Sequence, residues 1–238
     1  MSSTEFLTRR PIAHRGLHDE RARRMENSPS AFEAACLRDF AIELDVQLSA
    51  DNMAIVFHDE TLDRLTDQTG PLAGRTAAEL GRVKLGDTSD LIPTLAETLA
   101  LIDGRVPVVV EMKDNGPRNI ALAGAVAADL AGYAGPAAVM SFAHDLLTAF
   151  RDTDSAVPLG LTAEGIGTPA FVEHEKALAQ GISFVSYHVK ALPNPFVARV
   201  REELGLPVIT WTVRTPEDVA ATRDYADQMT FEGFDPDI

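Results

Sequence analysis

The feature that most constrains this chain is a regular alternation of short apolar runs with longer helical patterns. The runs are rich in β-branched residues, and some, such as Val106-Pro107-Val108-Val109-Val110, are apolar throughout, as strands covered on both faces should be. This alternation predicts βαβ units and a parallel sheet. The expected strands are 12–14, 41–46, 53–57, 106–112, 137–142, 157–161, 182–188, 207–213 and 228–231, and the expected helices are 30–39, 94–103, 118–131, 143–153, 169–180, 195–204 and 216–225.

The number of units favours a closed barrel. With residues 53–57 taken as a hairpin inserted after the second strand, the chain contains eight units, the number that a (β/α)8 TIM barrel requires. An open doubly wound sheet is the alternative, but no G-x-G-x-x-G turn opens the first helix. Residues 62–92 are rich in turn signals and predict a loop-rich insertion. We therefore expect residues 1–238 to form a single α/β domain, a TIM barrel with a small insertion after the second strand.

Helix starts are marked by threonine. Thr94, Thr168 and Thr215 are expected to cap their helices, and the last two are followed by a proline at the first helical position.

Composition limits the partners and the compartment. The net charge of −15 argues against nucleic acid and anionic membrane surfaces, while a small phosphate-bearing substrate stays compatible with a locally basic site. The sequence holds neither a secretory signal nor an apolar run of about 18 residues that could insert stably in a membrane. The single cysteine, Cys36, excludes an internal disulfide and is expected to be a small core side chain. We expect a cytoplasmic protein, for which the sequence is compatible with a monomer or a homodimer.

The first expected strand ends abruptly in His14-Arg15-Gly16. A buried strand has little reason to finish on an imidazole and a guanidinium, both of which can contact a phosphate. Gly16 permits a sharp turn without the steric cost of a Cβ. A surface turn would explain the three residues equally well, so the tripeptide alone does not establish a site.

Carboxylates follow the next two barrel strands. Glu43 and Asp45 are two residues apart and so point to the same side of their strand, and Glu111 and Lys113 repeat this spacing. Buried carboxylates repel one another unless a cation lies between them, which suggests one divalent cation, Mg²⁺ or Ca²⁺, held by Glu43, Asp45 and Glu111. Solvated acids and a structural Glu111–Lys113 salt bridge are the alternatives.

Further polar and aromatic residues end other strands. His58, after the run Ile55-Val56-Phe57, would form an acid–base pair with His14, and Asp59 would either orient an imidazole or open a turn. His188 and Trp211, the only tryptophan, also end strands, where Trp211 would form either a substrate wall or part of the core. The remaining histidines, His18, His144 and His174, are expected at the surface.

Taken together, these residues resemble the glycerophosphodiester phosphodiesterase family over nearly the whole chain. The order and spacing of the matching pieces are more specific than any single piece. The pieces are His14-Arg15-Gly16, Glu26-Asn27-Ser28, Glu43-Leu44-Asp45-Val46, Val56-Phe57-His58-Asp59, Ile92-Pro93-Thr94-Leu95-Ala96-Glu97, Val110-Glu111-Met112-Lys113, Ser141-Phe142 and Trp211-Thr212-Val213.

The resemblance implies a TIM barrel with an insertion and a metal-dependent hydrolysis of glycerophosphodiesters to glycerol 3-phosphate and an alcohol. It implies that His14 and His58 are the acid–base pair and that Arg15 and Lys113 contact the phosphate of a small phosphodiester. By the same resemblance, the three carboxylates hold the divalent cation. Two other activities are kept as alternatives: a phospholipase-like cleavage of a phospholipid or lysophospholipid head group, and a non-catalytic barrel that binds phosphodiesters.

The chain departs from the family pattern in two places. The turn after the second strand is Ser49-Ala50-Asp51-Asn52 instead of Thr-x-Asp-Gly, a small change because asparagine tolerates a left-handed conformation. At the last strand the family commonly has Thr-Asp-x-Pro, whereas this chain has Glu232 followed by Phe234. We therefore group Glu232 with Trp211 and His188 as candidate substrate-binding residues.

Overall fold

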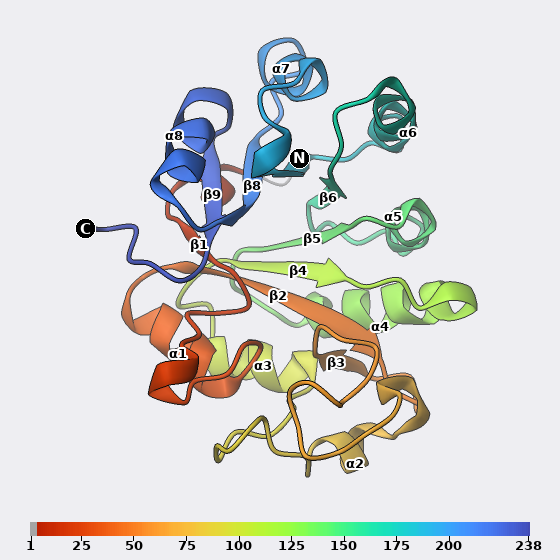
Figure 1. The fold of residues 1–238 in the computed structure, drawn as a ribbon. Helices are drawn as coiled ribbons and strands as arrows, with labels where there is room; N and C mark the ends of the chain where they lie inside the picture. The colour runs from red at the N-terminus through yellow and green to blue at the C-terminus, as the bar shows by residue number, and fades with distance from the viewer. Residues whose placement is uncertain (1–3) are drawn as a thin grey trace.

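The computed structural model describes residues 4–238, which contain nine strands and eight α-helices (Figure 1). Eight strands run parallel and close a barrel, because β1 pairs with both β2 and β9. β3 pairs antiparallel with β2 outside the barrel. The predicted (β/α)8 barrel is thus confirmed. The strands are β1 (Ile12–Ala13), β2 (Ala41–Leu48), β3 (Ala54–Val56), β4 (Val108–Met112), β5 (Ala137–Ser141), β6 (Leu159–Ala163), β7 (Phe184–His188), β8 (Val208–Val213) and β9 (Gln228–Phe231).

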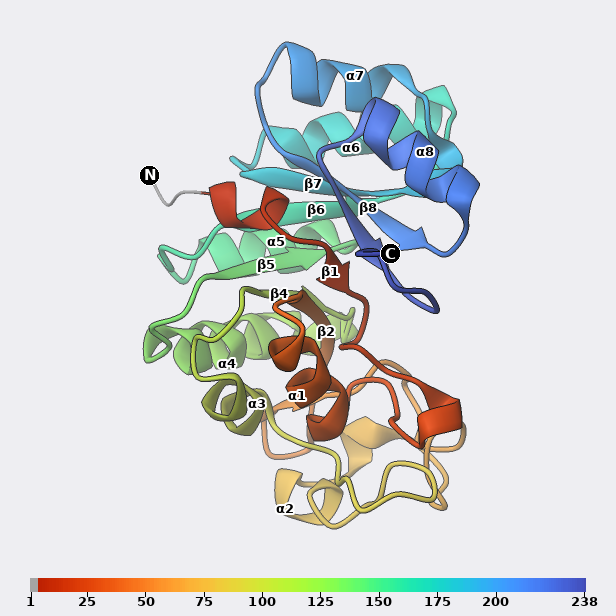
Figure 2. The same ribbon diagram turned by 90° about the vertical axis from the view of Figure 1, so that its left-hand side faces the viewer.

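The helices cover the outside of the barrel. In Figure 2, α6, α7 and α8 lie on one side of the strands, and α1, α3 and α4 lie on the opposite side. The helices are α1 (Pro29–Leu37), α2 (Ala77–Leu80), α3 (Leu95–Ile102), α4 (Asn119–Ala131), α5 (His144–Arg151), α6 (Thr168–Leu178), α7 (Pro195–Glu202) and α8 (Pro216–Tyr225).

Several local expectations were wrong. β4, β6 and β7 each begin two residues later than expected. Pro107 and Pro158 precede β4 and β6, and a proline has no N–H to donate to a neighbouring strand. α6 is capped by Gly167 and has Thr168 as its first residue, so the expected Thr168 cap does not form. Thr94 and Thr215 do cap α3 and α8, each through a capping box.

The interior of the barrel changes from apolar to polar along the strands. Alternate residues of β2 belong to the outer core between strands and helices, whereas Ala41, Glu43, Asp45 and Gln47 occupy the other parity and are all buried. At the amino-terminal end, Leu7 of the 3-10 helix η1 (Glu5–Thr8) packs with Ala41 and other apolar interior side chains. The polar interior residues therefore gather at the carboxyl end, where TIM barrels place their active sites.

Residues 62–92 form an excursion beside β3 (Figure 1) that contains the one-turn helix α2 and the 3-10 helix η3 (Leu72–Gly74). The excursion has its own apolar cluster, separate from the two barrel clusters. This apolar cluster consists of Ile55, Phe57, Leu62, Leu65, Leu72, Leu80, Val83, Leu85 and Ile92.

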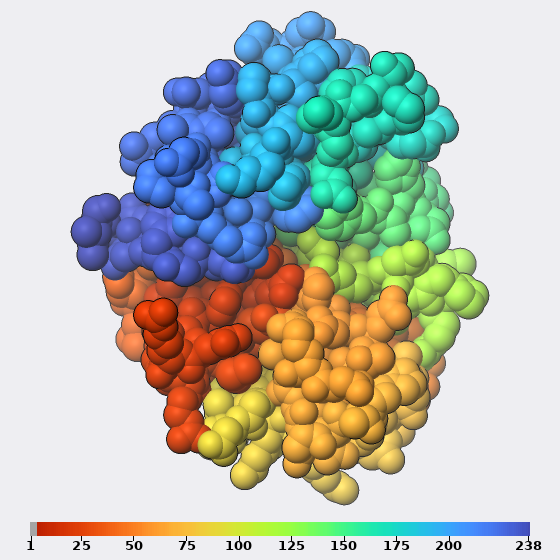
Figure 3. Space-filling model, viewed as in Figure 1, coloured from red at the N-terminus to blue at the C-terminus, as the bar shows by residue number. Residues whose placement is uncertain are grey.

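Figure 3 shows the segment after β1, the excursion and the loops of the C-terminal strands meeting on one face of the molecule.

Among residues 4–238, no helix has the length and apolar character needed to cross a membrane. Cys36 packs against the main core, as expected. His174, expected at the surface, is instead buried, because its ring packs against Phe171 of its own helix and against Tyr187 of β7 and Phe196 of α7.

Candidate active site

The end of β1 turns sharply and places His14 and Arg15 at the carboxyl end of the barrel. Arg15 and Gly16 both have positive φ, 55° and 78°. A Cβ on Gly16 would lie 2.9 Å from the Cβ of Ala31 in α1, so this position requires glycine for space as well as for conformation. The turn directs the backbone N–H of Arg15 to the Oε2 of Glu43, at 2.9 Å.

Glu43, Asp45 and Glu111 converge inside the barrel, and one carboxylate oxygen of each lies within 4.8 Å of the others. Their exposed fractions are 2%, 1% and 6%. Because β2 and β4 are parallel neighbours with Asp45 opposite Glu111, the two strand ends bring the three side chains together. The donor set consists only of oxygen atoms, which suits Mg²⁺ or Ca²⁺.

Two cationic side chains contact this carboxylate cluster. The Nζ of Lys113 lies 2.8 Å from the Oδ1 of Asp45 and also pairs with Glu111, and the Nε of Arg15 lies 3.2 Å from the Oδ2 of Asp45. Asn27, buried and in a left-handed conformation, donates its amide to the same Oδ2 at 2.9 Å. Asp45 is thus surrounded by donors, whereas Glu43 has fewer.

Burial and charge separate the pKa values of these acids. Burial, together with the neighbouring carboxylates, raises the pKa of Glu43 well above its usual range, and burial also raises the pKa of Glu111. Burial alone would raise the pKa of Asp45, but Lys113 and Arg15 lower it below its usual range. The cluster therefore holds more carboxylates than its two cations neutralise, which favours an added cation.

His14 is anchored through its Nδ1. Glu232, from the end of β9, places its Oε2 2.5 Å from this nitrogen, and its Oε1 accepts a hydrogen bond from the Nε of Arg214 at 2.7 Å. The other ring nitrogen, Nε2, lies 4.0 Å from the Oε2 of Glu43. Burial lowers the pKa of His14, and the contact with Glu232 only partly opposes this effect. The imidazole thus presents Nε2 to the carboxylate cluster.

His58 is held in a similar way from the segment after β3. Its Nδ1 lies 2.7 Å from the Oδ1 of Asp59, so of the two roles considered for this aspartate, orienting an imidazole fits the structure. Arg64 donates to both carboxylate oxygens of Asp59, at 2.6 and 2.8 Å, and this pairing lowers the pKa of Asp59 to about 2. The backbone N–H of Phe57, the residue before His58, donates to the carbonyl oxygen of Asp45 at 3.0 Å, so His58 directly follows a contact with the strand that carries Glu43 and Asp45.

Gln47 supports the backbone of His58. This buried side chain donates to the carbonyl oxygens of Phe57 and His58, at 3.3 and 3.0 Å, and also to that of Asp59. The segment that follows β3 is thereby tied to β2 from inside the barrel.

Glu26, in the loop between β1 and α1, links Arg15 after β1 with Arg64 of the excursion. Glu26 accepts a hydrogen bond from Arg15 at 2.8 Å and two from Arg64 at 2.7 and 3.0 Å. These bonds lower the pKa of Glu26 despite its partial burial, which by itself would raise it. Arg15 and the Asp59–Arg64 pair are therefore fixed relative to each other.

Aromatic side chains form a separate wall. The rings of His188 and Trp211 lie 4.7 Å apart, and Phe142, 43% exposed, packs edge-on against Trp211 at 5.3 Å. The Nε1 of Trp211 donates to the carbonyl of Ser186 at 3.3 Å. No contact with the carboxylate cluster is found for His188 or Trp211 among the described residues, so the structure places these two with each other at the ends of β7 and β8.

Sequence reasoning missed several residues of this site. Gln47 continues the two-residue spacing of Glu43 and Asp45 and could have been found by that signal, and Glu26 and Asn27 lie in a matching motif to which no role was given. Arg64 carried no local signal. His18, expected at the surface, is only partly exposed, because its loop folds back against Glu232, 3.8 Å away.

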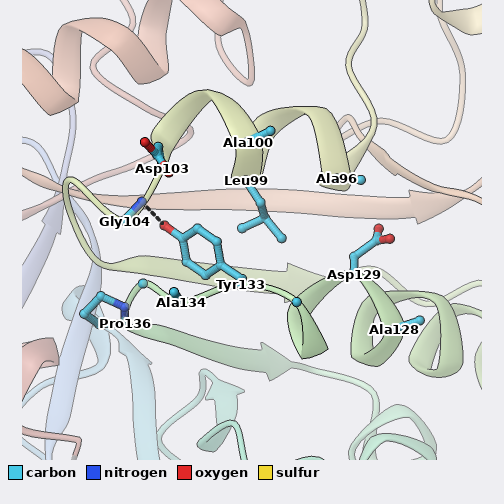
Figure 4. A pocket seen from close by; sticks show the side chains of 12 residues that line it. Ala96, Leu99, Ala100, Asp103, Gly104, Ala128, Asp129, Tyr133, Ala134 and Pro136 are labelled. Carbon is cyan, nitrogen blue, oxygen red and sulfur yellow. Dashed lines mark hydrogen bonds between the residues drawn. The ribbon is translucent and has the colours of Figure 1, made fainter.

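A hollow of about 690 Å³ lies elsewhere, between α3 and α4 (Figure 4). Its floor includes the loops that lead into β4 and β5, where the hydroxyl of Tyr133 accepts a hydrogen bond from the N–H of Gly104 at 3.1 Å. These loops are at the amino-terminal ends of the strands, opposite the carboxylate cluster. The hollow contains none of the expected site residues and is not part of the candidate active site.

The model of the glycerophosphoryl diester phosphodiesterase family matches residues 14–232. Glycerophosphodiester phosphodiesterase 1 of Bos taurus is 25% identical over 240 residues, covering 86% of this chain and 71% of that protein. A glycerophosphodiester phosphodiesterase of Caldanaerobacter subterraneus is 39% identical over 110 residues, 43% of this chain and 44% of that protein. The structure of an Oleispira antarctica phosphodiesterase in complex with the product sn-glycerol-3-phosphate superposes with a TM-score of 0.84 at 21% identity, covering 97% of this chain and 95% of that one.

Proposed function

Because the chain belongs to the glycerophosphoryl diester phosphodiesterase family and is therefore a phosphoric diester hydrolase, we propose that it hydrolyses glycerophosphodiesters to glycerol 3-phosphate and an alcohol. The product named for the Oleispira antarctica phosphodiesterase supports this substrate class. The observation that carries the proposal is the arrangement of two imidazoles, each with Nδ1 on a carboxylate, beside a buried cluster of three more carboxylates.

We propose Glu43, Asp45 and Glu111 as the ligands of one divalent cation. Their convergence within 4.8 Å, their burial and the raised pKa values of the two glutamates fit a hard cation with oxygen ligands. When bound, such a cation neutralises phosphate charge and polarises a P–O bond.

His14 and His58 are proposed to move the protons. With each Nδ1 fixed by Glu232 or Asp59, the free Nε2 can accept a proton from the attacking oxygen or donate one to the departing alcohol. One imidazole takes the proton of the attacking oxygen as that oxygen bonds to phosphorus, and the other gives a proton to the departing alcohol as its P–O bond breaks. Glu232, grouped above with the substrate-binding candidates, is here assigned to orient His14.

Arg15 and Lys113 are proposed to hold the phosphate oxygens. Both cations already lie on the carboxylate cluster, and burial alone would lower the pKa of Lys113, but Asp45 and Glu111 raise it, so the side chain stays charged. Trp211 and His188 are proposed to line the part of the site that receives the rest of the substrate, with Phe142 beside them. We further propose that residues 1–238 act as one domain, because β3 pairs with β2 and the excursion packs its apolar side chains against Ile55 and Phe57 at β3.

The test is the release of glycerol 3-phosphate from glycerophosphocholine and glycerophosphoglycerol in the presence of Mg²⁺ or Ca²⁺. His14→Asn and His58→Asn should each lower kcat by about 10²-fold or more while the thermal unfolding midpoint is kept. His144→Asn, which changes a histidine of α5 outside both contact sets, is the matched control and should be unaffected. Normal turnover in both site variants would refute the assignment.

The substrate panel also separates the alternatives. A long-chain lysophospholipid cleaved in preference to the water-soluble diesters would favour a phospholipase-like activity. A protein that binds glycerophosphodiesters but releases no product with any divalent cation would favour a non-catalytic barrel.

A further inference from the structure

The proposed reaction leaves His18 without a role. This histidine lies four residues after His14 in the loop that follows β1, and its Nε2 is buried without a hydrogen-bond partner among residues 4–238. Buried polar atoms are rarely left unpaired, so such a nitrogen calls for an explanation. The Oε2 of Glu232 lies 3.8 Å from this nitrogen, beyond hydrogen-bond distance.

His14, His18 and Glu232 together form a second potential ligand set. One nitrogen of each histidine and one carboxylate oxygen lie within 4.8 Å of one another. Two imidazoles and a carboxylate are the donor set that Zn²⁺ takes in many proteins, whereas the carboxylate cluster has only the oxygen ligands of a hard cation. The two sets share no residue.

We propose that His14, His18 and Glu232 bind Zn²⁺ or a similar transition-metal ion, and that this ion inhibits the enzyme. The inhibition follows because Zn²⁺ on the Nδ1 of His14 would release to solvent the proton that the imidazole shares with Glu232. Nε2 would then carry the one remaining ring proton, so it could not accept another, and it would donate that proton far less readily than an imidazolium. The metal site itself rests on the geometry alone, and only the inhibition rests on the proposed role of His14.

The surroundings of Glu232 support a ligand role. Its Oε1 is held by Arg214 at 2.7 Å, which leaves Oε2 turned toward both imidazoles. Ligating carboxylates are commonly fixed by such a hydrogen bond on their other oxygen. The positive charge of Arg214 also repels a cation, so we expect reversible binding in the micromolar range, as befits an inhibitory site more than a permanent one.

The site has access to solvent and needs little rearrangement. A groove of about 660 Å³ is lined by His18 and Glu232, together with side chains of both charges: Asp19, Glu20, Asp235, Arg21, Arg24 and Arg38. Arg38 pairs with Asp235, whereas Asp19 and Glu20 lie beside His18 in the same loop. Tetrahedral Zn²⁺ with bonds of about 2.0–2.1 Å separates its ligand atoms by roughly 3.3 Å. The 2.5 Å contact between His14 and Glu232 would therefore widen by somewhat less than 1 Å, and His18 would move closer.

The experiment titrates Zn²⁺ into the enzyme at saturating Mg²⁺ and measures both turnover and binding by calorimetry. The variants are His18→Gln, which removes one proposed ligand outside the catalytic machinery, and His144→Gln as the matched control. We expect all three proteins to have the same turnover without Zn²⁺. His18→Gln should need roughly tenfold more Zn²⁺ or greater for half-inhibition and for binding, since even an outer partner of a metal ligand is worth that much.

Equal inhibition and equal binding in His18→Gln and the unmodified protein would overturn the proposal. If the unmodified protein hydrolyses no glycerophosphodiester, the proposed function fails, and calorimetry alone still decides the metal site. His18→Ala is the second variant if His18→Gln unfolds, as checked by its thermal midpoint. Its Zn²⁺ binding should be weakened in the same way, and unchanged binding would refute the site.

Discussion

Gln47 offers the sharpest test of how the fold positions the chemistry. Replacing it by leucine keeps the approximate volume but removes the amide that donates to the carbonyl oxygens of Phe57, His58 and Asp59. The side chain is 4% exposed, so the carbonyl of Phe57 has no ready replacement from solvent. The other two carbonyls lie in partly exposed residues and can turn toward water.

The magnitude follows from that count. One buried carbonyl left without a donor costs about 1–3 kcal/mol, and we take about 2 kcal/mol for Gln47→Leu. For a protein of this size, that loss lowers the thermal midpoint by about 4–8 °C. Because the freed segment carries His58, kcat should also fall by about 10- to 100-fold, the range expected when a catalytic group is misplaced by up to 1 Å.

The assays are thermal unfolding followed by circular dichroism and release of glycerol 3-phosphate at saturating substrate. Gln180→Leu is the control, because Gln180 accepts a side-chain hydrogen bond from Thr148 far from the site. A Gln47→Leu protein that loses stability but keeps its kcat would show that His58 is positioned by other contacts. Unchanged stability would refute the energetic argument itself.

Three other perturbations probe the Arg64–Asp59 pair, the proposed cation and the buried His174. Arg64→Gln should lower kcat about tenfold, because Asp59 would lose the guanidinium that holds it against His58. Added guanidinium should partly restore the activity of Arg64→Ala, and a lack of rescue would count against this role of Arg64. Mg²⁺ or Ca²⁺ at about 100 times its Kd should stabilise the metal-free protein by about 2.7 kcal/mol, or about 5–10 °C, and Glu111→Gln should reduce this shift in a thermal melt. Burial lowers the pKa of His174, so at low pH the folded state binds fewer protons at this residue than the unfolded state does. The stability that the buried neutral imidazole contributes is complete above about pH 6.5 and is lost as pH falls toward the lowered pKa. Urea unfolding between pH 5 and 7.5 should show a smaller loss of stability in His174→Phe.

The barrel could be predicted because each of its units carries a local signal. Apolar runs, caps such as Thr94 and Thr215, and the polar residues that end each strand are all readable within a few positions. The two-residue spacing of Glu43 and Asp45 likewise predicted that their side chains lie on the same side of β2. Errors came where one residue overrides the pattern, as Pro158 does at the start of β6.

The part of the site that escaped prediction consists of pairs distant in sequence. Nothing near Arg64 shows that it will reach Glu26 and Asp59 together, and nothing near His18 shows that its loop will fold against Glu232. His174 was misplaced because a histidine in an amphipathic helix is usually solvated, whereas here an aromatic cluster on adjacent elements covers it. These contacts are set by barrel closure, which no short window of sequence contains.

The closure of the barrel by β1 and β9 also has a consequence for biosynthesis. His14 and Glu232 are 218 positions apart, and their contact joins the first and last strands. At about 5–20 residues per second, a ribosome delivers the second partner roughly ten seconds or more after the first. A nascent chain can thus assemble the carboxylate cluster from β2 and β4 long before it can anchor His14. The anchoring of His14 is therefore the last of the proposed site's contacts to become possible, after every other strand of the barrel has been made.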